Sequence, residues 1–118
     1  MKLTLSVNLP AVAACIAIGL SGQSIAFAGS LVAWGRDDDG QVTGVPIQTD
    51  FVAISAGREH GLALKGDGSI VAWGHNGYGQ CNVPAPNADF VAIAGGAFHS
   101  LGLKANGSVV AWGRNNYG

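Results

Sequence analysis

Three histidines are the side chains in this sequence best suited to acid–base or metal chemistry. His60 and His99 lie 39 residues apart at one position of a repeated pattern, whereas His75 lies at a slot whose counterparts are Arg36 and Arg114. A catalytic residue needs to occur only once, so the recurrence favours a structural role for His60 and His99. We expect, for example, a ring nitrogen bonded to the backbone of a neighbouring repeat. We interpret the slot of His75 as a polar surface position.

No other arrangement indicates catalysis. The sequence contains no Cys–His pair with zinc spacing, and no combination of serine, histidine and aspartate stands out. The run Asp37, Asp38, Asp39, Gly40 resembles the start of a calcium loop, but the other ligands of an EF-hand are missing. We therefore expect a non-enzymatic protein with no metal and no cofactor.

The charge pattern argues against nucleic-acid binding. The 118 residues include six basic and seven acidic side chains, for a net charge of -1. The basic residues are scattered singly and form no positive stripe that could follow a phosphate backbone. We expect protein partners and no nucleic acid.

Residues 1–28 have the layout of a secretory signal peptide. Lys2 precedes an apolar run at 11–20, and Ala26 and Ala28 supply small residues before a predicted cut after position 28. A lipoprotein-type cut before Cys15 is the alternative, and the apolar run is too short for a membrane anchor. We expect a secreted or extracellular protein, with the periplasm and the cell surface left open, and no membrane contact after cleavage. Residues 29–118 would then keep Cys81 as their only cysteine, which we interpret as an apolar filler.

Residues 29–118 repeat with a period of 39. Ser-Leu-Val-Ala-Trp-Gly at 30–35 returns with single changes at 69–74 and 108–113, and 51–79 shares 18 of 29 residues with 90–118. Each full unit holds three short runs rich in Val, Ile and Trp, at 51–56, 60–65 and 70–74 and again at 90–95, 99–104 and 109–113. This pattern predicts an all-β fold of about two three-stranded antiparallel units, and a period near 40 is typical of propeller blades or a related array.

Tight hairpins and a leucine face follow from the same pattern. Asp67-Gly68 and Asn106-Gly107 lie between the second and third runs, where a turn needs positive φ. Leucines alternate with small residues in the second run, so they occupy one face of the sheet. The predicted repeat core consists of Trp34, Trp73, Trp112, His60, His99, Leu62, Leu64, Leu101 and Leu103.

Strand direction places the loops after the first and third strands of each unit at one end of the sheets, opposite the hairpins. Loops on a rigid scaffold carry binding residues, and Arg, Tyr and Phe are favoured at interfaces. The predicted partner-binding face consists of Arg58, Glu59, His75, Asn76, Tyr78, Phe98, Arg114, Asn115 and Tyr117.

The run Gly-Ala-Phe-His-Ser-Leu-Gly-Leu-Lys at 96–104, followed by Asn106-Gly107 and Val-Ala-Trp-Gly-Arg-Asn-Asn-Tyr-Gly at 110–118, resembles the regulator-of-chromosome-condensation repeat. The 39-residue period, the linker at 79–84 and the secretion signal are more similar to bacterial extracellular members, such as the propeller-type beta-lactamase inhibitory proteins. The resemblance implies a seven-bladed propeller with three-stranded blades. In those inhibitory relatives, aromatic residues just before the histidine position grip the partner, and here Phe98 fits that slot whereas Glu59 does not.

Seven such blades would need about 273 residues, so we expect either a fragment of a larger extracellular protein or self-association through exposed blade edges. The leading expectation is a secreted, non-enzymatic protein-interaction module. An inhibitor of an extracellular enzyme such as a beta-lactamase is the alternative. A hydrolase or lyase is disfavoured because nothing chemical is unique to one repeat.

Overall fold

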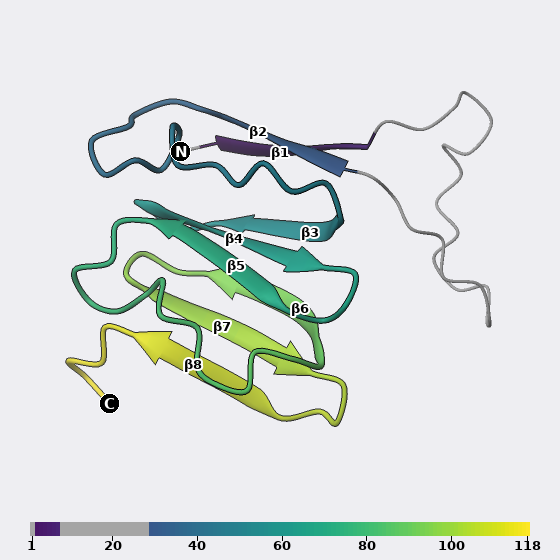
Figure 1. Cartoon of the computed structure of the whole chain (residues 1–118). Helices are drawn as coiled ribbons and strands as arrows, with labels where there is room; N and C mark the ends of the chain where they lie inside the picture. The colour runs from purple at the N-terminus through teal and green to yellow at the C-terminus, as the bar shows by residue number, and fades with distance from the viewer. Residues whose placement is uncertain (1, 8–28) are drawn as a thin grey trace.

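The computed structural model describes residues 2–7 and 29–118, which form three antiparallel sheets arranged side by side in chain order (Figure 1). The first sheet pairs β1 (Lys2–Val7) with β2 (Gly29–Trp34). The other two sheets contain β3 (Phe51–Ala56), β4 (His60–Lys65) and β5 (Ile70–Gly74), then β6 (Phe90–Gly95), β7 (His99–Lys104) and β8 (Val109–Gly113). The predicted all-β fold and the bounds of its six strands are confirmed.

The predicted cleavage site and the apolar run at 11–20 lie outside the described residues. Strand β1 lies within the predicted signal peptide and pairs antiparallel with β2, with Lys2 opposite Trp34. The signal peptide at 1–28 stays a prediction. In the described segments, no helix has the length and apolar character needed to cross a bilayer.

The hairpins between the second and third strands use glycine as expected. Gly68 has a φ of 83° and Gly107 a φ of 87°. In the first hairpin, the Asp67 carboxylate accepts hydrogen bonds from the backbone N–H of Ser69 at 2.9 Å and from its hydroxyl at 2.6 Å. Asn106 makes the same two bonds to Ser108. Both turns are fixed by local hydrogen bonding, which sets the register of the strands they join.

Each sheet has two different faces, which we call the Leu face and the Trp face. In the sheet β3–β4–β5, the Leu face carries Leu62, Leu64 and Ile70, and the Trp face carries Phe51, Ala63 and Trp73. Gly61 pairs with Trp73, and a Cβ at Gly61 would overlap the indole ring. The small residues of the second strand therefore make room for the aromatic side chains.

The sheets pack with a Leu face against a Trp face. Leu62, Leu64 and Ile70 form one buried cluster with Phe90 of the next sheet. On the opposite side of the same sheet, Phe51, Ala63 and Trp73 form a cluster with Leu31 of β2. The middle sheet is therefore covered on both faces, and most of the buried apolar side chains lie at these two interfaces.

Four of the predicted core residues differ from the expectation. Trp34, Leu101, Leu103 and His99 are exposed, although they occupy the positions of Trp73, Leu62, Leu64 and His60. Trp34 lies on the Trp face of the first sheet, and the other three lie on the Leu face of the last sheet. Neither face is covered by another sheet within the described residues. The repeat position sets the direction of a side chain, and its burial needs a neighbouring sheet.

Candidate functional site

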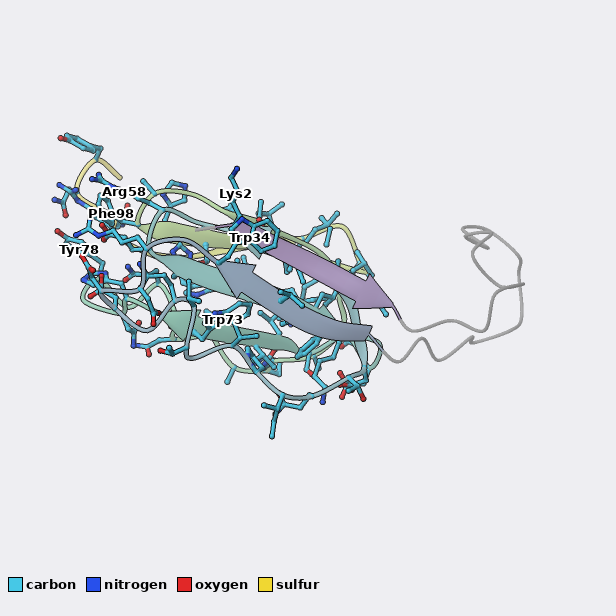
Figure 2. The ribbon with its side chains drawn as sticks, turned by 90° about the horizontal axis from the view of Figure 1, so that it is seen from above. Lys2, Trp34, Arg58, Trp73, Tyr78 and Phe98 are labelled. Atoms are coloured by element: carbon cyan, nitrogen blue, oxygen red, sulfur yellow. The ribbon has the colours of Figure 1, made fainter. Side chains whose placement is uncertain are left out.

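The loops that follow β3, β5, β6 and β8 emerge at one end of the sheets, opposite the hairpins (Figures 1 and 2). Within each of the two complete sheets, a backbone hydrogen bond joins the loop after the first strand to the loop after the third strand. The N–H of His75 donates to the carbonyl of Glu59 at 2.8 Å, and the N–H of Arg114 donates to the carbonyl of Phe98 at 2.8 Å. The loop end is thus a firm platform built from two repeats.

Four side chains from both sheets contact one another on this platform, and we call them the arginine–aromatic cluster: Arg58, Tyr78, Phe98 and Arg114. The guanidinium carbons of Arg58 and Arg114 lie 5.5 and 5.6 Å from the centre of the Phe98 ring. Arg114 also lies 5.3 Å from the centre of Tyr78, whose ring is 5.2 Å from that of Phe98 at an angle of 59°. Cation–π contacts of this kind orient both arginines over aromatic faces.

Two predicted residues support the cluster. Glu59 is partly buried, and its carboxylate lies 3.7 Å from Nε of Arg58. The ring centres of His75 and Tyr78 lie 5.9 Å apart. The Nδ1 of His75 accepts a 2.7 Å hydrogen bond from the side-chain amide of Gln80. The same glutamine accepts a bond from the N–H of Tyr78 at 2.9 Å. Gln80 therefore fixes the loop that carries Tyr78.

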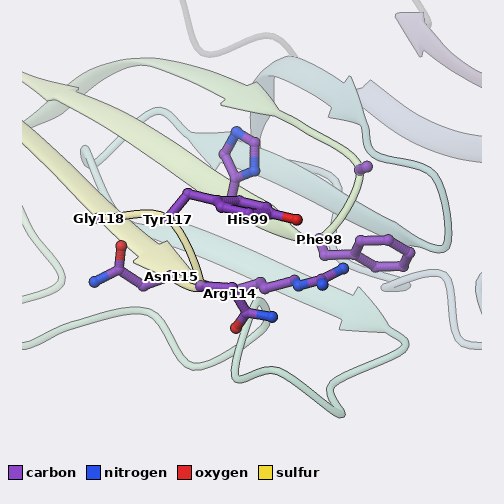
Figure 3. Close-up of a pocket in the computed structure, with 8 residues that line it drawn as sticks. Phe98, His99, Arg114, Asn115, Tyr117 and Gly118 are labelled. Atoms are coloured by element: carbon purple, nitrogen blue, oxygen red, sulfur yellow. The ribbon is translucent and has the colours of Figure 1, made fainter.

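The other predicted residues have different surroundings. The amide of Asn76 donates to Asn82 and accepts from the N–H of Cys81, so it holds its own loop in shape. Tyr117 is 98% exposed. Asn115 and Tyr117 line an open hollow of about 300 Å³ together with Phe98 and Arg114 (Figure 3). The predicted loop face is thus one surface, with the arginine–aromatic cluster beside a shallow depression.

His60 belongs to the contact between the sheets rather than to this surface. Its Nε2 lies 2.9 Å from the Ser100 hydroxyl of the next sheet, and both residues are fully buried. Ser100 donates its only hydroxyl proton to the Gln80 carbonyl at 2.8 Å, so it accepts a bond from Nε2–H of a neutral His60. The expected contact between repeats is present at this position, but its acceptor is a side chain and not the backbone.

A family model for the regulator of chromosome condensation (RCC1) repeat matches residues 51–80 and 90–118. The two matches coincide with the sheets β3–β4–β5 and β6–β7–β8 and with the loops that follow them. The chain belongs to the RCC1 repeat family.

Several solved structures are similar to this chain. Prp20p from Saccharomyces cerevisiae is 26% identical, with a TM-score of 0.64 over 76% of this chain and 28% of Prp20p. The ectodomain of the receptor kinase CR4 from Physcomitrella patens is 26% identical, with a TM-score of 0.63 over 71% of this chain and 24% of that one. The C-terminal domain of gp131 from bacteriophage phiKZ is also 26% identical, with a TM-score of 0.52 over 56% and 18%. This chain therefore spans less than a third of each of them. No curated protein sequence matches it.

The stability of these RCC1 repeats is expected to depend on pH through His60. The pKa of His60 lies below its ordinary value of 6.5. Burial of the ring is the largest cause, and the charges of His99 and His75 lower the pKa further. Between the lowered pKa and 6.5, the unfolded chain binds a proton that the folded chain does not. The free energy of unfolding should therefore fall as the pH decreases below about 6.5, and urea titrations at several pH values would measure this.

His60→Gln keeps an amide N–H for Ser100 and removes the titrating group, so the decline should become shallower. His99→Gln is the matched control, because it changes the same repeat position at an exposed site. An equal change of slope in both variants would contradict the assignment to His60.

Sequence reasoning missed the role of two buried glutamines, Gln41 and Gln80. The backbone carbonyl of Gln41 accepts a 3.0 Å hydrogen bond from the Trp73 indole N–H. The backbone carbonyl of Gln80 likewise accepts a 2.8 Å hydrogen bond from the Trp112 indole N–H. Both glutamines are at most 1% exposed. Their recurrence at a spacing of 39 residues was the available signal.

The residues considered for metal or thiol chemistry have structural contacts. Asp37 accepts bonds from the N–H groups of Val42 and Thr43, and these bonds lower the pKa of its carboxyl group. Burial raises the pKa of the Cys81 thiol to about 11. In residues 2–7 and 29–118, no group of three or more His, Cys, Asp or Glu side chains is placed to hold a metal ion.

Proposed function

We propose that this chain is a secreted, non-enzymatic protein-interaction module that binds its partner through the arginine–aromatic cluster. RCC1-repeat propeller blades are typically protein-interaction modules. Among the similar proteins, Prp20p has binding properties toward Gsp1p and histones. The observation that carries the proposal is the stacking of Arg58 and Arg114 on Phe98 at the loop end.

The chemistry of the cluster favours a partner segment that combines acidic and aromatic side chains. Guanidinium groups that are held over an aromatic ring keep outward N–H donors for carboxylates. Arg58 is 64% exposed in its side chain, and Tyr78 is 45% exposed as a residue. Arginine and aromatic residues are also the types that dominate binding energy at protein interfaces.

Secretion is the second part of the proposal. It rests on the basic, apolar and small-residue segments of residues 1–28 and on the similarity of the 39-residue repeats to bacterial extracellular propellers. Mass spectrometry of the exported chain would test it, with a new N-terminus at Gly29 as the expected result.

Selection from a displayed library of random peptides tests the interaction surface. We expect enrichment of peptides with acidic and aromatic residues. Phe98→Ala should weaken their binding at least tenfold, which corresponds to about 1.4 kcal/mol. Asn106→Ala, at the opposite end of the same sheet, should leave binding unchanged. Peptides that bind both variants equally, or no enrichment at all, would reject this surface.

Inhibition of an extracellular enzyme is a second candidate, because Phe98 occupies the aromatic position before the histidine and lies at the centre of the cluster. A panel of beta-lactamases assayed with micromolar protein would test it. We expect loss of any inhibition in Phe98→Ala. If no enzyme is inhibited by the wild-type chain, this candidate fails while the peptide-binding proposal stands.

A further inference from the structure

The two outermost faces of the three sheets are exposed and chemically different. The last sheet exposes its Leu face, with Leu101 at 36%, Leu103 at 38% and Val109 at 65%. Their counterparts in the middle sheet, Leu62, Leu64 and Ile70, are at most 3% exposed. The Leu faces of the middle sheet and of the last sheet therefore have the same apolar character and differ only in whether another sheet covers them.

The first sheet exposes the opposite kind of face. Val32 is 50% exposed and Trp34 is 46% exposed, whereas Trp73, at the same repeat position as Trp34, is 7% exposed. Figure 2 shows Trp34 on the outer side of the first sheet, close to Lys2. Val32 and Trp34 belong to β2, and their register partners Thr4 and Lys2 belong to β1, which lies before the predicted cleavage site.

The molecule itself shows what such faces bind. A Leu face meets a Trp face twice within the chain, once between the first and second sheets and once between the second and third. In the second case, the Phe90 ring lies against Gly102 and reaches the Ile70 side chain. The exposed Leu face of the last sheet holds an apolar hollow of about 240 Å³, lined by Leu101, Leu103, Val109 and the alanines of β6. Two complementary faces thus lie at opposite ends of one chain.

We propose that copies of this chain associate head to tail, with the Leu face of the last sheet in one copy covered by the Trp face of the first sheet in another. The contact joins two different surfaces, so each bound pair still exposes one face of each kind. The chain can then extend to larger assemblies as its concentration rises. Neither face contains a member of the arginine–aromatic cluster, so this inference is independent of the proposed partner binding.

Sedimentation and light scattering of the full chain over a range of concentrations test the proposal. We expect the mean mass to rise with concentration in the wild type. Leu103→Glu, on the Leu face, and Trp34→Glu, on the Trp face, should each be monomeric on their own. Mixed together, the two variants should form a one-to-one dimer, because each retains the face that the other has lost.

The mixing result separates this contact from its alternatives. Contact between identical faces predicts that only one of the two variants loses association and that mixing restores nothing. Pairing through strand edges predicts that both variants still associate. Either result, or a wild-type chain that stays monomeric at the highest concentration, would overturn the proposal.

Controls address folding and the position of the interface. Val109→Glu and Val32→Glu change the same two faces at sites that are at least half exposed, and they should reproduce the first pair. Circular dichroism would identify any variant that has lost the sheets. Tyr78→Glu, in the arginine–aromatic cluster, should leave the association unchanged, since the loop end lies on neither face.

Discussion

Leu62→Ala is expected to lower the free energy of unfolding by about 3 kcal/mol, because it removes a fully buried side chain and leaves a cavity between two sheets. Leu62 packs with Leu64 and Ile70 of its own sheet and with Phe90 of the next sheet. The two sheets cannot move close enough together to fill the space that a smaller side chain would leave. Urea titration of the full chain, followed by circular dichroism, would measure the change.

Leu101→Ala is the matched control, since it makes the same chemical change 39 residues later. Leu101 is 36% exposed, so its truncation should cost less than about 1 kcal/mol. Both variants have to be measured at a concentration where the chain is dissociated, because association would cover Leu101. Equal losses at the two positions would contradict the arrangement of the sheets.

Ser100→Ala is expected to destabilise the chain by about 2 kcal/mol through a hydrogen bond rather than a cavity. The variant removes the acceptor of the His60 Nε2–H and one of the two donors to the Gln80 carbonyl. Both groups are buried, so water cannot replace the lost partner. Urea titration at a pH above 7 keeps His60 neutral in both states and isolates this effect.

Ser108→Ala provides the comparison for a hydroxyl that is exposed in a hairpin, and its cost should stay within about 0.5 kcal/mol. A double-mutant cycle with His60→Leu tests the assignment to the contact between sheets. In the background of His60→Leu, Ser100→Ala should cost clearly less than alone, because no Nε2–H remains to lose its acceptor. Independent effects would show that the bond does not couple the two sheets.

The strands were predictable because each is a short run of Val, Ile, Leu and Trp between glycine-containing turns. The 39-residue repeat gave two aligned views of the same pattern, which fixed the bounds of all six strands and the direction of the loops. Strand direction then placed Arg58, Tyr78, Phe98 and Arg114 at one end before any contact was known.

Burial and specific partners could not be read from the repeat in the same way. Leu62 and Leu101 are equivalent in sequence, and only the presence of a neighbouring sheet separates them. The partner of His60 was missed because Ser100 replaces the glycine found at position 61, so the repeat gave no consistent polar residue. Stacking in the cluster depends on rotamers, which spacing along the chain does not determine.

The bonds between the two complete sheets have a consequence for how such a gene can grow. His60 reaches Ser100, and the Ser55 hydroxyl reaches the N–H of Gly95, and both steps cover 40 residues. One repeat away, Ser55 has alanine at position 94 and Ser100 has glycine at position 61, so a tandem duplication of 39 codons would keep the spacing of these contacts without supplying a second pair of hydroxyl groups. Growth by whole units therefore preserves the distance along the chain between donor and acceptor positions, but each added unit needs its own polar side chains there, whereas an insertion of a few codons inside a unit would change that distance.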